Sequence, residues 1–189
     1  MSEPDAKYHL PVLLTPVLEA ARGARRVVDA TLGDGGHAAA LLGLGAQVLG
    51  IDRDPDAIAI SRSRLGQSDI QYFQGSFGSP EALETVARFE PDFILLDLGV
   101  SSRQLDDEGR GFTFRPGAPL DMRMGSAHDT AAFLLNEAGA ATLEQIFRDY
   151  GDERRSRRLA AEIVRRRQRQ RFSTSDESSF FLRCIDRTR

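Results

Sequence analysis

A glycine turn followed by acidic residues is the part of this sequence best suited to chemistry. It reads Gly33-Asp34-Gly35-Gly36 and comes soon after an aliphatic run that ends at Asp29. Glycine permits positive φ angles and lets a ligand approach the backbone, and the N-terminus of a following helix offers unpaired N–H groups. Several kinds of nucleotide site share these properties. The turn therefore predicts a nucleotide-type cofactor without deciding which one.

The acids around the turn bear on which cofactor it holds. A dinucleotide would bring its pyrophosphate against Asp34, where like charges repel each other. S-adenosylmethionine instead carries a cationic sulfonium and an ammonium, which Asp29, Asp34 and Asp97 would attract. The acids therefore favour S-adenosylmethionine over NAD.

Two further residues extend the expected site. Asp52 closes the second aliphatic run, near the offset of roughly 20 residues at which an acid reaches ribose hydroxyls. It could instead cap the helix beginning at Pro55, although Asp54 is better placed for that role. Phe77 follows the third run, and its ring could lie near the adenine or pack in the core. We expect Asp52 to bind the ribose and leave both interpretations of Phe77 open.

Alternating strands and helices must position these residues. Strands are expected over 26–30, 47–52, 70–74 and 93–98, and helices over 36–42, 55–65 and 80–89, with an earlier helix from Thr15. This alternation with apolar strands predicts an α/β fold, a Rossmann-like parallel sheet covered on both faces. Ligands of such sheets bind beyond the carboxyl ends of the strands, where Asp29, Asp52 and Asp97 fall.

The alternation stops after residue 98. A loop rich in Gly, Arg and Phe (99–125) gives way to a helical pattern, so we expect a domain boundary near Gly125. Residues 1–125 would form the cofactor domain and residues 126–189 a helical subdomain that binds the substrate. Within the latter, a helix over 152–170 is expected to bury one apolar stripe. The stripe consists of Leu159, Ala160, Ile163 and Val164.

Charge is distributed unevenly. Residues 148–171 contain ten arginines against four acids, a local charge of +6 in a chain of net charge −3. A concentrated basic segment on an acidic body indicates a directed contact with a polyanion. The alternative is a solvated helix face with pairs such as Glu162 to Arg166. We expect RNA contact, because ten arginines exceed what solubility needs.

A second candidate substrate contact lies in the loop over 110–123, which combines Phe112 and Phe114 with three arginines: Arg110, Arg115 and Arg123. Aromatic rings and guanidiniums suit stacking on an unstacked base and pairing with phosphates. The alternative is that both phenylalanines anchor the loop in the core.

Composition excludes several classes. No stretch approaches the roughly 20 apolar residues of a membrane span, and the acidic start Met1 to Asp5 is unlike a signal peptide. Cys184 is the only cysteine, which excludes a disulfide framework and a cysteine-based zinc site. We therefore expect a soluble cytoplasmic protein with no membrane partner and no bound metal.

Several strings of residues resemble the MraW family, ribosomal RNA small subunit methyltransferase H. The most specific are Asp29 to His37, Leu95 to Ser102 and Pro119 to Met124. Shorter ones are residues 9–14, 50–55, 104–107, 110–114 and 150–154. The resemblance runs from Tyr8 to about Thr174, so it covers most of the chain.

The resemblance implies methylation of the exocyclic N4 of a cytidine in small-subunit ribosomal RNA, with S-adenosylmethionine as donor. The substrate would be that RNA or the ribosomal subunit, and the oligomeric state is left open. The family's cofactor contacts fall on Gly35, Gly36, His37, Asp52, Phe77, Asp97 and Gln104. For His37 this replaces the structural role that spacing alone suggests. Family members continue well past Arg189, so a truncated chain is expected, and the alternative function is a cofactor-binding fragment without catalysis.

The residues also bear on which atom is methylated. Methylating a ring carbon of a pyrimidine usually requires a cysteine nucleophile, and Cys184 lies far along the chain from any strand end. Transfer to nitrogen fits better, with Asp97 as the acceptor that holds the amine. The usual amino-methyltransferase signature, Asp or Asn followed by two prolines and an aromatic, is absent, so no general base is assigned. A small-molecule methyltransferase is a third hypothesis, and it predicts activity that is insensitive to salt.

Overall fold

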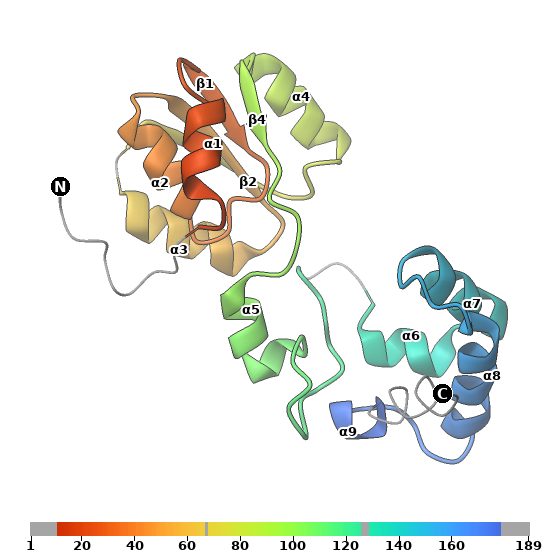
Figure 1. Ribbon diagram of the computed structural model, residues 1–189. Helices are drawn as coiled ribbons and strands as arrows, with labels where there is room; N and C mark the ends of the chain where they lie inside the picture. Colours follow the sequence, from red (N-terminus) through yellow and green to blue (C-terminus); the bar gives the residue numbers. More distant parts are fainter. Residues whose placement is uncertain (1–10, 67, 126–128, 179–189) are drawn as a thin grey trace. The chain divides into compact units, whose positions relative to one another are not determined.

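The computed structural model describes residues 11–66, 68–125 and 129–178 (Figure 1). These residues form two compact units, which divide between Gly99 and Val100. Cys184, and the first two residues of the motif at 9–14, lie outside the described residues.

The loop before Gly125 groups with the second unit, although the sequence predicts the domain boundary after this loop. The Leu120 N–H donates to the carbonyl of Ser173 at 3.0 Å, and the Ser175 N–H donates to that of Ala118 at 2.8 Å. Leu120 is also part of the second unit's hydrophobic core. Composition, which placed the boundary at Gly125, does not reveal such pairing between distant residues. The cofactor-binding and substrate-binding roles of the two parts stay predictions.

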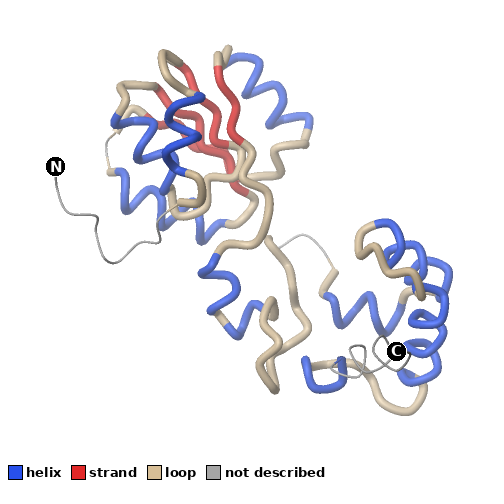
Figure 2. The backbone as a smooth tube through the Cα atoms, in the orientation of Figure 1, coloured by secondary structure: helices blue, strands red, loops and turns tan. Residues whose placement is uncertain are grey.

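A four-stranded parallel sheet forms the centre of the first unit, as the sequence predicts, with strand order β3-β2-β1-β4. The strands are β1 Arg26–Asp29, β2 Gln47–Asp52, β3 Ile70–Gln74 and β4 Phe93–Leu95. Figure 2 shows them side by side in red. The expected extension of β4 to residue 98 is wrong, because its pairing with β1 stops where Leu95 is in register with Asp29. The carboxyl ends of the strands are therefore aligned at one edge.

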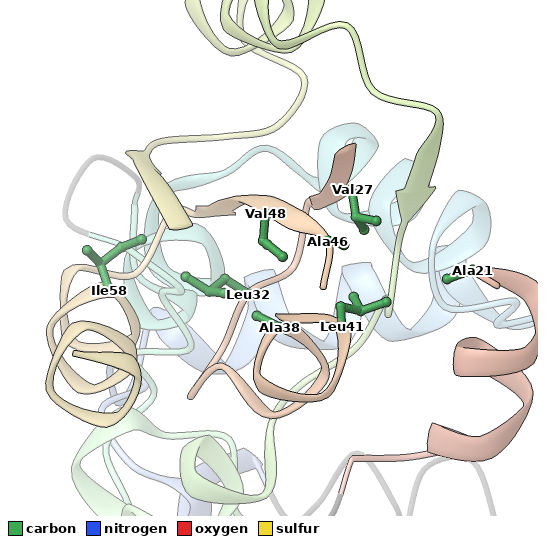
Figure 3. Packing of buried hydrophobic residues seen from close by; sticks show 8 residues of the cluster. All are labelled: Ala21, Val27, Leu32, Ala38, Leu41, Ala46, Val48 and Ile58. Carbon is green, nitrogen blue, oxygen red and sulfur yellow. The ribbon is translucent and has the colours of Figure 1, made fainter. Parts of the chain in front are cut away.

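Helices cover both faces of this sheet. They are α1 Leu14–Ala20, α2 Gly36–Gly43, α3 Pro55–Leu65 and α4 Pro80–Phe89. Val27 and Val48 belong to the hydrophobic cluster under α1, α2 and α3 (Figure 3), whereas Val28 and Leu49 belong to the cluster under α4. This separation follows from the alternation of side chains along a strand. Coverage is incomplete at the edge strand β4, where Ile94 is 52% exposed.

Local sequence explains where α3 and α4 begin. The Asp54 carboxylate accepts the Asp56 N–H at 3.0 Å, and the Ser79 hydroxyl accepts the Ala82 N–H at 3.2 Å. Each cap residue is followed by a proline, whose missing N–H costs little in the first turn. The prediction that Asp54 caps α3 is confirmed, so Asp52 is not needed as the cap.

The second unit is mainly helical. It contains α5 Ser102–Asp106, the 3₁₀ helix η1 Glu108–Arg110, α6 Ala131–Glu137, α7 Ala140–Asp149, α8 Ser156–Arg167 and α9 Ser175–Ser178. The predicted apolar stripe of α8 packs in a core with residues of α6 and α7. The expected start of α8 at residue 152 is wrong, because Asp152 has a left-handed φ of 49°. No helix among the described residues is long and apolar enough to cross a membrane.

Candidate functional site

Acidic side chains from successive strands meet at the carboxyl edge of the sheet. Asp29 ends β1, Asp52 ends β2, and Asp97 follows β4 by two residues. His37 and both other carboxylates are near enough to Asp29 to act on its charge. The edge that the sequence predicts as a ligand site therefore gathers three acids and a histidine from separate segments of the first unit.

The glycine turn brings backbone N–H groups to the same edge. Gly35 precedes α2 with a left-handed φ of 75°, a conformation that glycine adopts without steric cost. A Cβ atom there would lie 2.6 Å from the Ser61 hydroxyl, so the position has no room for a side chain either. A Cβ on Gly36 would similarly come 2.6 Å from the Pro11 ring. Both predicted glycines thus keep the backbone close to its neighbours at the start of α2.

Asp52 holds the glycine turn in place. One carboxylate oxygen accepts the Gly33 N–H at 2.8 Å, and the other accepts the Asp54 N–H at 2.9 Å. Sequence reasoning weighed ribose binding against helix capping and did not foresee this contact with the turn. A carboxylate has about four lone-pair sites, so these two bonds leave capacity for ribose hydroxyls. The ribose contact stays a prediction.

His37 and Asp97 face each other beside the turn. His37 is 7% exposed, and its Nε2 lies 2.9 Å from the Val12 carbonyl oxygen. A carbonyl only accepts, so Nε2 donates in this contact. Nδ1 lies 3.9 Å from an oxygen of Asp97, whose side chain is 50% exposed. The half-exposed Asp97 carboxylate beside this ring suits a ligand that brings N–H groups or a positive charge.

Asp97 is itself held by a residue that sequence reasoning missed. Its backbone N–H donates to the Thr31 hydroxyl at 2.8 Å, which ties the end of β4 to the turn after β1. The neighbouring N–H of Thr31 donates to Asp29 at 3.3 Å. Thr31 lies inside the motif Asp29 to His37, and this position was the one sign in the sequence that Thr31 belongs to the site.

Asp29 is the most perturbed carboxyl of the first unit. It is 1% exposed, and its second oxygen has no hydrogen-bond partner among the described residues. Burial raises the pKa of Asp29 to about 6; the Thr31 N–H and His37 act against this rise, and the charges of Asp52 and Asp97 add to it. Because this oxygen is enclosed, Asp29 would act on a ligand at the edge through its charge, which favours a cation over a phosphate.

Phe77 lies in the turn between β3 and α4 and is 42% exposed. The interpretation as a core residue is therefore wrong, because the cores of the first unit do not include this ring. The Gly75 N–H donates to the Asp52 carbonyl at 2.8 Å, so this turn begins next to the end of β2. The contact with adenine stays a prediction.

The remaining predicted residues lie in the second unit. Gln104 is 9% exposed, and its side-chain oxygen accepts the Ser101 N–H at 3.0 Å as part of a capping box that begins α5. Phe114 is 89% exposed, so its interpretation as a core anchor is wrong, while Phe112 is half-buried. Arg123 pairs with Asp121 at 2.8 Å and holds the pKa of that carboxyl below its usual range.

Arg110 is also half-buried, and its backbone carbonyl accepts the Met122 N–H at 3.0 Å. Contact of these loop residues with substrate stays a prediction. Within the described part of the chain, no three His, Cys, Asp or Glu side chains are grouped so that they could hold a metal ion.

The fold and this edge together define a class. A parallel sheet with a glycine turn after its first strand and acids at successive strand ends is a Rossmann-like α/β fold of the methyltransferase type. The MraW methylase family matches residues 6–184, and the chain belongs to that family.

Named relatives agree with this assignment. The chain is 49% identical over 185 residues to the ribosomal RNA small subunit methyltransferase H of Gemmatimonas aurantiaca. The matched region covers 94% of this chain and 58% of that protein. It is 41% identical over 177 residues to the protein of the same name from Deinococcus radiodurans, which covers 92% of this chain and 56% of that protein. The chain thus spans little more than half the length of these relatives.

Proposed function

We propose that this chain provides the S-adenosylmethionine site of an enzyme that methylates the exocyclic N4 of a cytidine in small-subunit ribosomal RNA. The observation that carries the proposal is the meeting of Asp29, His37, Asp52 and Asp97 beside a glycine turn, in a member of the MraW methylase family. Relatives bearing the name ribosomal RNA small subunit methyltransferase support the substrate.

The residues at the sheet edge fit the donor. The half-exposed carboxylate of Asp97 suits the ammonium and sulfonium charges, the buried Asp29 would act on them through its charge, and Asp52 keeps lone pairs for ribose hydroxyls. Phe77 offers an exposed ring for the adenine. When bound, S-adenosylmethionine supplies an electrophilic methyl carbon. Gly35, Gly36 and His37 would complete the part of its site that lies in the first unit.

The protein's part in the transfer is to position the amine. The lone pair of an exocyclic amine is delocalised into the ring, so a hydrogen bond from its N–H to Asp97 would hold the nitrogen in line with the methyl carbon. The Thr31 hydroxyl accepts the backbone N–H of Asp97, and His37 lies beside its carboxylate, so this acceptor is fixed before substrate arrives. Such prior orientation lowers the barrier without requiring an assigned general base.

Transfer of labelled methyl to small ribosomal subunits that lack the modification tests the proposal. Asp97→Ala should lower the rate about a hundredfold or more, the loss expected when a positioning contact is removed. Asp69→Ala is the matched control, because Asp69 is an exposed carboxylate at the opposite end of the sheet. Nucleoside analysis should find N4-methylcytidine, and label on a ring carbon would contradict the proposed chemistry.

Two further results would contradict the proposal in different ways. Calorimetric binding of S-adenosylmethionine by the unaltered chain without transfer would leave a cofactor-binding fragment. Transfer to a small molecule at a rate independent of salt would replace RNA as the substrate, since RNA binding through arginines weakens as salt rises.

A further inference from the structure

Some arginines of the second unit have no part in its internal bonding. Of the ten in residues 148–171, five contact carboxylates or backbone carbonyls: Arg148, Arg165, Arg166, Arg167 and Arg171. Arg155 has a partner as well. The other four are exposed and make no ion pair or side-chain hydrogen bond within the described residues: Arg154, Arg157, Arg158 and Arg169. The predicted ion pairing with Glu162 therefore accounts for some arginines of residues 148–171 and leaves others without a carboxylate partner in the part of the chain that the structure describes.

Two of these arginines occupy the outer face of α8. The inner face is buried through Ala160 and Ile163, which pack against α6 and α7. Arg157 and Arg158 are both exposed; Arg158 lies opposite that stripe, and Arg157 lies on its flank. The exposed apolar residue beside them is the small Ala161. The outer face is thus cationic and nearly free of apolar surface.

An exposed aromatic ring stands at the turn that leads into α8. Tyr150 ends α7 and is 87% exposed, with no hydrogen bond from its hydroxyl among the described residues. Arg154 is four positions further along the chain, so the two Cα atoms lie within about 14 Å of each other. The exposed ring and the exposed guanidinium of Arg154 therefore lie close together on the chain, immediately before α8.

The turn itself holds Tyr150 in place. The Glu153 N–H donates to the Phe147 carbonyl at 3.0 Å, and the Ser156 N–H donates to the Glu153 carbonyl at 3.1 Å. A Cβ on Gly151 would lie 2.9 Å from the Phe147 carbonyl oxygen, so glycine permits this close approach. These contacts fix the backbone on either side of Tyr150, which lowers the entropy cost of ordering the turn when a ligand binds.

The chemistry of this surface selects its partner. Unpaired guanidiniums attract phosphates, and an exposed ring stacks on a base that is not already stacked in a duplex. A double helix would offer the phosphates but leave the ring unused. A membrane-binding helix needs large apolar residues opposite its basic face, and the apolar face of α8 is buried in the core.

We propose that Tyr150, Arg154, Arg157 and Arg158 form a binding surface for single-stranded RNA. The ring stacks on one unpaired base, and the guanidiniums pair with neighbouring phosphates. The inference rests on the proposed function, because it gives the ribosomal RNA substrate a docking surface on the second unit. This surface is separate from the loop that carries Phe112 and Phe114.

Binding of a fluorescein-labelled oligocytidylate, about 12 nucleotides long, to the full chain tests the ring first. Fluorescence anisotropy should show that Tyr150→Ala weakens binding about tenfold while Tyr150→Phe, which keeps the ring, binds like the unaltered chain. A blunt duplex of the same length should show little difference between the two variants. Circular dichroism should find both variants folded, because this side chain is 87% exposed. Equal binding of the single strand by Tyr150→Ala and the unaltered chain would overturn the proposal.

A salt series tests the arginines. The triple variant Arg154→Ala, Arg157→Ala, Arg158→Ala should reduce the slope of log affinity against log salt by about 2, since each lost phosphate contact on a single strand contributes about 0.7. The matched triple variant at Arg148, Arg165 and Arg171 removes the same charge from guanidiniums that already have carboxylate partners. Its slope should change by less than about 1. Equal slopes for the two triple variants would overturn the proposal.

Failure of this inference is distinguishable from failure of the proposed function. A chain that binds the oligonucleotide through this surface but transfers no methyl group supports the surface and contradicts the enzyme. A chain that methylates subunits while both sets of variants bind RNA normally overturns the surface alone. Normal oligonucleotide binding by Tyr150→Ala, with lost binding to ribosomal subunits, would assign the surface to a ribosomal protein and overturn the proposal too.

Discussion

The first unit buries charged side chains, whereas the second keeps its charges at the surface. Among the described residues, Asp29, His37 and Asp54 are at most 7% exposed. The buried polar side chains of the second unit are uncharged: Gln104, Ser156 and Ser175. The two patterns suit different partners, because a small cationic cofactor can neutralise an enclosed carboxyl and a long polyanion needs charges within its reach.

One carboxyl from each unit shows the contrast. Burial raises the pKa of Asp29 to about 6, and the charges around it do not compensate. The guanidiniums of Arg165 and Arg166 lower the pKa of Glu162 to about 2. No lysine or arginine of the described residues is among the groups that shift the pKa of Asp29, whereas Glu162 bonds to two guanidiniums. The comparison indicates that a buried carboxyl whose charge is not compensated identifies the small-ligand site better than the presence of charge alone.

The largest effect that would test this contrast is at Asp29. With a pKa of 3.8 in the unfolded chain and about 6 in the folded one, Asp29 loses its proton first in the unfolded state as pH rises. Stability should therefore fall by about 3 kcal/mol between about pH 4 and about pH 6, and Asp29→Asn should remove that fall. Urea denaturation followed by circular dichroism across this range measures it.

The control for Asp29 is the exposed Asp69, whose replacement by Asn should leave the slope unchanged. A uniform shift of the whole curve by the amide leaves the comparison intact, whereas a pH slope that persists in Asp29→Asn would place its source elsewhere and break the comparison. A cationic donor should also lower the pKa of Asp29, so S-adenosylmethionine binding should tighten as pH rises through about 6 and release a proton.

A smaller effect is expected at the glycine turn. Alanine at Gly35 would carry a left-handed backbone at a cost of about 1–2 kcal/mol, and its Cβ would lie 2.6 Å from the Ser61 hydroxyl oxygen. We expect S-adenosylmethionine binding to weaken by about tenfold, the equivalent of about 1.4 kcal/mol, as measured by calorimetry.

Gly45 provides a matched control for Gly35. It also has a left-handed φ, of 83°, but a Cβ there would meet nothing within 4 Å. Gly45→Ala should lose stability and keep donor affinity, and adding Ser61→Ala to Gly35→Ala should restore part of the affinity. Equal donor affinity in both glycine variants would mean that the turn does not contact the ligand.

Much of the first unit follows from sequence. Proline and a capping side chain fix the starts of α3 and α4, and the apolar runs of β2 and β3 have the bounds expected of them. The errors at β4 and α8 depend on tertiary pairing and on one left-handed residue, Asp152, which no periodicity reveals.

The candidate site divides in the same way. The meeting of Asp29, Asp52 and Asp97 follows from the rule that parallel strands align their carboxyl ends. The Thr31 contact with Asp97 and the Val12 contact with His37 depend on side-chain conformation and on a segment outside the strands. Sequence therefore predicts which acids meet, and not which neutral groups hold them.

The smallest effect expected is at Glu162, and its sign should be opposite to that of Asp29. Its pKa falls from 4.5 to about 2 on folding, so the stability it contributes is present above about pH 4.5 and is lost as pH falls toward 2. The arginine partners are 53% and 41% exposed, so solvent screening limits this contribution to less than about 1 kcal/mol.

Glu162→Gln should therefore lower stability slightly at neutral pH and flatten the acid limb of the curve, as measured by urea denaturation. Glu144→Gln is the matched control, because Arg148 keeps Asp149 as a second partner. Since Asp29 and Glu162 share no partners, the double variant should lose both pH slopes additively. A loss of several kcal/mol in Glu162→Gln would mean that this carboxylate supports the interior of the second unit, and the contrast between enclosed and exposed charge would no longer hold.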